Sequence, residues 1–121
     1  MRYFFDTYAL IELLGRKDFL RYSAKGFATS RWNLAELLLF DLREHDEAAA
    51  RRHFARFLGA CHEPSDEDLF QAAVFREAQR RRRRLLSYVD ALGYVLARRL
   101  SLRFLTGDDE FRGLPNVLFV K

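Results

Sequence analysis

The chain alternates between short apolar runs and longer segments with helical periodicity. Residues 3–5 form a continuous aromatic run that ends at Asp6, which is typical of a short buried strand. Residues 102–105 and 116–120 have the same character, and residues 25–29 are a further candidate strand. Between these runs, apolar residues recur at helical spacing. This spacing predicts helices over residues 8–14, 18–24, 32–44, 47–59, 67–86 and 87–100.

Residues suited to helix N-caps precede several of these segments. We expect Thr7 to cap the first helix and either Thr29 or Ser30 to cap the helix over residues 32–44. After the break at Pro64, either Ser65 or Asp66 is expected to cap the next helix, and Ser87 the last one. Short apolar strands interleaved with helices predict an α/β fold with a parallel central β-sheet flanked by α-helices. At 121 residues, the chain is expected to form a single domain over residues 1–121.

Two acidic residues follow predicted strands. Asp6 ends the first apolar run, and Asp108 follows residues 102–105 after a short turn. In open α/β sheets, ligands bind outside the carboxyl ends of the strands, so these two carboxylates are expected to lie together. Glu36 and Asp90 are two further acids within apolar helical stretches. The four acids Asp6, Glu36, Asp90 and Asp108 are therefore the candidate catalytic and metal-binding residues.

Each acid also has a structural interpretation when it is taken alone. Asp90 stands three residues after Ser87, as in a capping box. Glu36 could face solvent, and the acids at residues 108–110 could form an ordinary acidic turn. The combination is more informative, because two carboxylates about 4 Å apart repel each other by about 4 kcal/mol at an effective dielectric of 20. A divalent cation removes this repulsion.

Oxygen ligands favour Mg²⁺ or Mn²⁺ over zinc, which prefers Cys and His. Such ions activate water for the hydrolysis of a phosphodiester, a reaction that needs no Ser, Cys or His nucleophile. The three histidines show no metal-ligand spacing, so we interpret them as surface or structural residues.

The net charge of +4 is compatible with an anionic partner. Cys61 is the only cysteine, so no disulfide can form within the chain and a reducing, cytoplasmic setting is expected. The start of the chain lacks the long apolar run of a signal peptide, and no apolar run approaches the length of a bilayer span. We therefore expect no association with a membrane.

The acidic motifs together resemble the PIN domain family, in particular its VapC-type toxins of toxin–antitoxin pairs. Residues 5–7 with 9–11 resemble the first acidic motif of that family, and residues 33–37 resemble the second. Residues 90–92 resemble the third motif, and residues 105–108 resemble the closing one. The resemblance extends over nearly the whole chain.

This resemblance implies a ribonuclease that depends on Mg²⁺ or Mn²⁺, with the same four acids in the active site. It also implies an RNA substrate, a cognate antitoxin protein and a homodimer. Thr7 and Thr106 would support the acids. Glu110 departs from the family pattern, in which many members have Asp before the closing Phe, and Asp109 is an additional acid. Either one could join the site.

Five consecutive arginines, residues 80–84, fall within a predicted helix. They span more than one turn, so they cannot all face one ligand. One interpretation is a solvated helix end. The other is that Arg80 and Arg84, together with Arg76, contact RNA phosphates.

Three rival functions remain open. The chain could be a PIN-like nuclease of RNA processing, or a PIN-like module that binds RNA or protein without cutting. A phosphoacceptor domain of the receiver type also gathers acids at strand ends. It requires a lysine nearby, and the only late lysine is Lys121 at the last position, so we consider this alternative the weakest.

Overall fold

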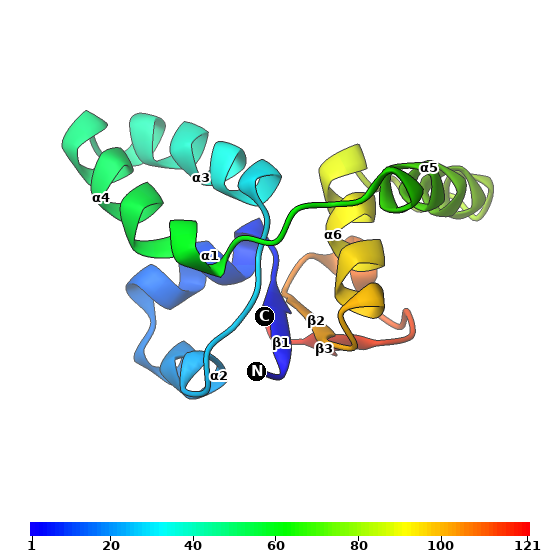
Figure 1. Cartoon of the computed structure of the whole chain (residues 1–121), viewed down its shortest axis with the longest axis horizontal. Coiled ribbons are helices and arrows are strands. Elements are labelled where there is room, and N and C mark those ends of the chain that lie inside the picture. The colour runs from blue at the N-terminus through cyan, green and yellow to red at the C-terminus, as the bar shows by residue number, and fades with distance from the viewer.

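The computed structural model describes residues 1–121 as three strands, six α-helices and three short 3₁₀ helices (Figure 1). The strands are β1 (Tyr3–Phe5), β2 (Arg103–Thr106) and β3 (Val117–Phe119). The α-helices are α1 (Thr7–Gly15), α2 (Leu20–Ser23), α3 (Arg31–Glu44), α4 (Glu47–Phe57), α5 (Asp66–Arg81) and α6 (Tyr88–Arg99). The 3₁₀ helices are η1 (Lys17–Phe19), η2 (Leu58–Ala60) and η3 (Asp109–Phe111).

The strands form one parallel sheet in the order β1-β2-β3. In this register Phe5 lies opposite Leu105, and Leu105 lies opposite Leu118. The predicted α/β class with a parallel sheet flanked by helices is thus confirmed. The predicted strand over residues 25–29 is wrong, because this segment makes only an isolated bridge from Ala28 to Phe4 and another from Thr29 to Cys61.

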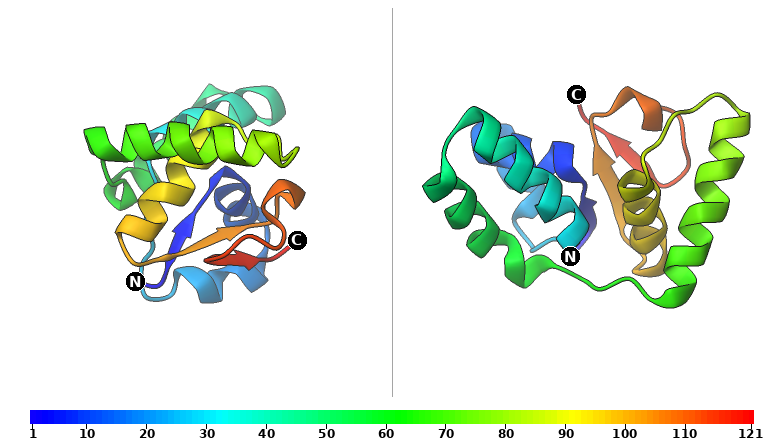
Figure 2. Two further views of the ribbon diagram at one scale, coloured as in Figure 1. Left: turned by 90° about the vertical axis from the view of Figure 1, so that its right-hand side faces the viewer. Right: turned by 90° about the horizontal axis from the view of Figure 1, so that it is seen from above.

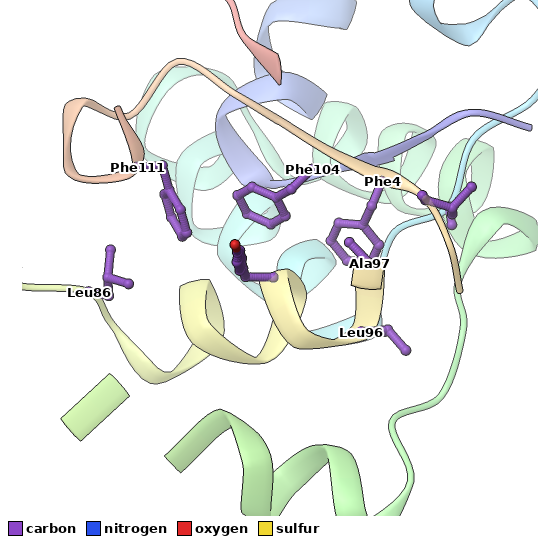
Figure 3. Close-up of a cluster of buried hydrophobic side chains, with 9 residues drawn as sticks. Phe4, Leu86, Leu96, Ala97, Phe104 and Phe111 are labelled. Carbon is purple, nitrogen blue, oxygen red and sulfur yellow. The ribbon is translucent and has the colours of Figure 1, made fainter. Parts of the chain in front are cut away.

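Consecutive side chains of the strands enter different cores on the two faces of the sheet. Phe4 and Phe104 pack with residues of α6, whereas Phe5 and Leu105 pack with residues of α1, α3 and α4. Figures 1 and 2 show the resulting arrangement, with α1 to α4 on one side of β1 and α5 and α6 on the other. The core beside α6 is rich in aromatic rings (Figure 3). This alternation follows from the two-residue repeat of a strand.

Helix caps fix where the long helices begin. Ser30, Ser65 and Ser87 each accept a hydrogen bond from a backbone N–H in the first turn, as predicted. The prediction for Thr7 is wrong, because Asp6 has the extended backbone of an N-cap and its carboxylate accepts the N–H of Ala9 at 2.8 Å. Asp6 therefore starts α1 and also ends β1.

Helix α5 ends earlier than the sequence pattern predicts. The N–H of Arg83 bonds to the carbonyl of Arg80, and the N–H of Arg84 bonds to that of Gln79. These two bonds form a Schellman motif, with Arg83 in the left-handed conformation (φ 63°) that glycine usually occupies. The five arginines are consequently not all helical, because the chain reverses at Arg82 and Arg83.

One polar contact with a buried carboxylate joins α3 to α4. Asp41 is fully buried, and its Oδ2 lies 2.8 Å from Nδ1 of His53. This contact gives His53 a structural role, as the sequence analysis expected. None of the helices is both long and apolar enough to cross a membrane.

Candidate active site

All four candidate acids line one cavity of about 620 Å³ at the carboxyl edge of the sheet. They come from four separate segments: Asp6 follows β1, Glu36 lies on α3, Asp90 lies in the first turn of α6, and Asp108 follows β2. The other lining residues are Thr7, Tyr8, Ser87, Gly107, Asp109, Glu110 and Lys121. Parallel pairing of β1 with β2 brings the first and last acids together, although about a hundred positions separate them in the sequence.

Asp6 is the most deeply buried of the four, with 3% of its surface exposed. Burial raises its pKa to about 8, although hydrogen bonds from the Thr106 side chain and the Ala9 N–H oppose this shift. The charges of Asp90 and Asp108 raise it further. In this environment the protonated form of Asp6 is favoured up to about pH 8, and ionisation of Asp6 at neutral pH is therefore costly.

Backbone N–H groups orient Asp90 and Asp108. Asp90 accepts the N–H of Ser87 at 3.1 Å, so the capping box expected from the sequence is present and the same side chain lines the cavity. Burial raises the pKa of Asp90, hydrogen bonds with Ser87 lower it, and the charges of Asp108 and Glu36 raise it. Asp108 accepts the N–H of Glu110 at 3.0 Å. One oxygen of each carboxylate is held, and the other has no hydrogen bond from the protein.

Glu36 reaches the cavity from the opposite helical layer. Its Oε1 accepts a hydrogen bond of 2.6 Å from the Thr7 hydroxyl, which in turn accepts one of 3.2 Å from the Asn33 side chain. Thr7 thus fixes the carboxylate of α3 beside the start of α1. Thr106 has a comparable position on β2, where its hydroxyl accepts the N–H of Asp108 at 3.0 Å.

A family model for the PIN domain matches residues 3–116, which is nearly the whole chain. The chain belongs to the PIN domain family. The match includes the segments that carry all four acids, and it confirms the family that the acidic motifs suggested. No curated protein matches the chain in sequence.

Solved structures of similar fold include several toxin–antitoxin proteins. VapBC2 from Rickettsia felis, bound to a DNA fragment from its promoter, has a TM-score of 0.76 at 19% identity and covers 99% of this chain and 98% of its own. The sarcin–ricin loop cleaving toxin VapC20 of Mycobacterium tuberculosis has a TM-score of 0.76 at 21% identity, with 98% of both chains covered. A toxin–antitoxin complex from Klebsiella pneumoniae has a TM-score of 0.73 at 22% identity, with 95% of this chain and 94% of the other covered. At these identities, the likeness establishes the fold.

The cavity of this PIN domain offers a suitable donor set for a divalent cation. The acids that line it offer carboxylate oxygens, which are the ligand atoms that Mg²⁺ and Mn²⁺ prefer. No positively charged side chain is among the groups that shift the pKa of the buried Asp6. As the side chains stand, no three of the acids are grouped closely enough to hold an ion. Mg²⁺ commonly binds through one or two carboxylates together with water, so a cluster of three protein ligands is not a requirement.

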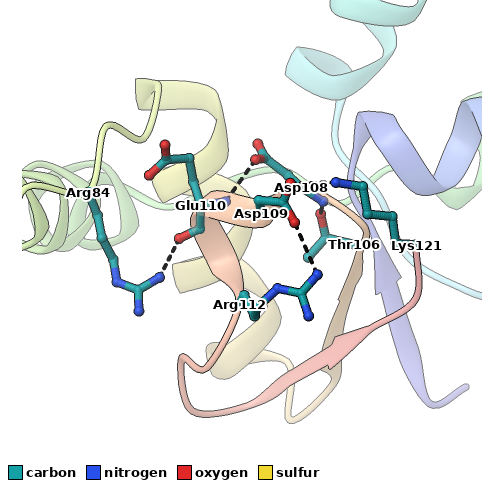
Figure 4. Close-up of polar contacts among 7 residues, drawn as sticks. All are labelled: Arg84, Thr106, Asp108, Asp109, Glu110, Arg112 and Lys121. Atoms are coloured by element: carbon teal, nitrogen blue, oxygen red, sulfur yellow. Dashed lines mark hydrogen bonds and ion pairs between the residues drawn. The ribbon is translucent and has the colours of Figure 1, made fainter.

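The structure separates the acids that the sequence analysis left undecided (Figure 4). Asp109 pairs with Arg112 and with Lys121, and these cations hold its pKa below the usual range. Glu110 is held toward the segment between α5 and α6, because its carboxylate accepts the N–H of Leu85 at 3.1 Å. Both residues line the cavity, but each already has a partner within the protein.

Sequence reasoning missed some of the residues around this cavity. It discounted Lys121 because of its terminal position, yet Lys121 lines the cavity. Its position follows from the short stretch of chain that extends beyond β3 at the same edge of the sheet. Tyr8 was also missed, since its aromatic ring looked like an ordinary member of an apolar helix.

Gly107 lies where the chain passes closest to Tyr8. A Cβ at this position would lie 2.2 Å from the Tyr8 ring and 2.6 Å from the backbone oxygen of Val120. We expect Gly107→Ala to lower the free energy of unfolding by about 1–3 kcal/mol, as overpacking typically does. Urea unfolding monitored by circular dichroism measures the change.

Gly15→Ala is the matched control for this substitution, because nothing lies within 4 Å of its Cβ position. It should leave stability unchanged or slightly increased. Equal stability of the two variants would contradict the close approach at Gly107.

Proposed function

We propose that this PIN domain is an endoribonuclease that depends on Mg²⁺ or Mn²⁺, and that it is the toxin of a toxin–antitoxin pair. The observation that supports the nuclease most directly is the convergence of four carboxylates, from four distant segments, on one cavity. Burial and the neighbouring charges of Asp90 and Asp108 disfavour the charged form of Asp6, and a divalent cation would favour it, which supports a metal-dependent site. We propose that activity resides in the cytoplasm, where RNA is available.

Asp6, Glu36, Asp90 and Asp108 would hold the cation. When bound, a divalent cation supplies Lewis-acid chemistry: it activates water as a nucleophile and offsets charge on the phosphate. The protein's own contribution is orientation, because Thr7, the Ser87 N–H and the Glu110 N–H each fix one carboxylate before substrate arrives. The hydroxyl of Thr106 plays the same role for Asp6.

The proposed partners are an antitoxin protein and a second copy of the chain. The antitoxin is supported by the fold shared with VapBC2 and with the toxin–antitoxin complex from Klebsiella pneumoniae. The second copy is supported by exposed apolar side chains on α3, where Trp32, Leu39 and Leu42 each have at least half of their surface exposed. Sedimentation of the purified chain measures its association.

Expression in a bacterial host tests the toxin role. We expect induced wild-type protein to arrest growth, and we expect co-expression of the adjacent gene product to relieve the arrest. Asp6→Asn should permit growth at a comparable protein level. RNA cleavage in vitro without growth arrest would instead favour a nuclease of RNA processing, and RNA binding without metal-stimulated cleavage would favour a module that binds without cutting.

A further inference from the structure

A second hollow, of about 290 Å³, adjoins the acidic cavity and has the opposite charge. It is lined by Arg76, Arg80 and Arg84 together with Leu85, Leu86 and Ser87. Ser87 also lines the acidic cavity, so the two hollows share a wall. No acidic residue lines the basic hollow.

We infer that this arginine hollow is a phosphate-binding subsite, which holds a backbone phosphate of the RNA strand beside the one that is cut. This inference rests on the proposed nuclease function, and it names the residues that position the substrate. The interpretation of the arginines as a solvated helix end holds for residues 81–83, which are exposed and do not line the hollow. It does not account for the three arginines that converge on the hollow.

Backbone carbonyls hold two of these guanidinium groups in place. Arg76 donates from Nε to the carbonyl of Leu86 at 2.9 Å, and Arg84 donates from Nη1 to the carbonyl of Glu110 at 2.7 Å (Figure 4). A neutral carbonyl orients a guanidinium without cancelling its charge. These arginines are therefore preorganised and remain available for an anion.

The balance of charges around the arginine hollow also favours a bound anion. Glu77 is the only carboxylate paired with this cluster, and it is shared between Arg76 at 3.5 Å and Arg80 at 3.4 Å. Three positive charges thus face one negative charge, whereas other arginines, such as Arg16 and Arg99, have close carboxylate partners. Like charges gathered around a hollow repel one another unless an anion occupies it.

The turn after α5 fixes the distance between the two hollows. The Schellman motif at Arg83 reverses the chain so that Arg84 faces Glu110. The Glu110 carboxylate accepts the Leu85 N–H, while its own N–H is bonded to Asp108. Glu110 therefore links the arginine hollow to the carboxylate cavity, which explains why this acid is directed away from the proposed metal ligands.

Binding of a fluorescent single-stranded RNA to Asp6→Asn protein, at fixed Mg²⁺ and varied KCl, tests the subsite without cleavage. We expect the additional substitution Arg80→Gln to weaken binding several-fold and to reduce the slope of log K against log salt by about 0.7, the value for one lost phosphate contact on a single strand. Arg80 has no partner except Glu77, so its replacement leaves the backbone contacts of Arg76 and Arg84 intact.

Arg51→Gln is the matched control. Like Arg80, Arg51 is an exposed arginine on a helix that is paired with a glutamate. Unlike Arg80, it lines neither the acidic cavity nor the arginine hollow. Equal affinity and equal salt slope for the Arg80 and Arg51 variants would overturn the subsite, even if the wild-type protein cleaves RNA. If the wild-type protein fails to cleave RNA but binding still depends on Arg80, the subsite stands and the nuclease proposal falls.

Discussion

Asp6→Asn is expected to lower metal-stimulated RNA cleavage by more than about 100-fold. Loss of a residue that merely supports a metal ligand costs about 10- to 100-fold, and Asp6 is proposed as a ligand itself. The substitution should not unfold the protein, because Asn is as good an N-cap as Asp and can still accept the N–H of Ala9. Cleavage of a labelled RNA, measured with and without Mg²⁺, quantifies the loss.

Asp46→Asn provides a closely matched control. Asp46 caps α4 through the N–H of Ala49, just as Asp6 caps α1, but it does not line the cavity. We expect this variant to cleave RNA at the wild-type rate. Cleavage by Asp6→Asn at the rate of Asp46→Asn would refute the four-carboxylate site, whatever the stability of the two proteins.

The second large effect concerns stability and pH in the absence of metal. The pKa of Asp6 is raised from 3.8 to about 8 in the folded protein. Folding therefore favours the protonated form, and this group destabilises the protein progressively as pH rises from about 4 to about 8. Each unit of pKa shift corresponds to about 1.4 kcal/mol, so the expected loss reaches several kcal/mol above pH 8.

Urea unfolding in EDTA at several pH values measures this loss. The free energy of unfolding of wild-type protein should fall between pH 5 and pH 8.5, and Asp6→Asn should largely remove the fall. Added Mg²⁺ should stabilise the wild type more at pH 8.5 than at pH 5, since the ion competes with the proton for the carboxylate. Parallel stability curves for Asp6→Asn and wild type would show that Asp6 is not the responsible group.

The features that could be predicted from sequence are those with a strong local signal. The aromatic run at residues 3–5 and the apolar run before Asp108 are continuous enough to read as buried strands, and both are strands of the parallel sheet. The structure also brings the four predicted acids to one cavity.

The features that sequence reasoning missed depend on context beyond the local pattern. Residues 25–29 are apolar enough for a strand, yet only Ala28 bridges to β1 before the chain turns into α3. Helix α5 ends without the glycine that usually marks a Schellman motif, because Arg83 adopts the left-handed conformation itself. A run of five arginines gives no local signal for where the backbone should reverse.

The pairing of β1 with β2 also determines when the acidic cavity can form during folding. The two strands are paired although about a hundred residues separate them in the sequence. Parallel pairing over such a separation must close a loop of nearly the entire chain. The cavity that needs both Asp6 and Asp108 is therefore complete only after this long-range pairing has formed, and partly folded forms of the chain lack it.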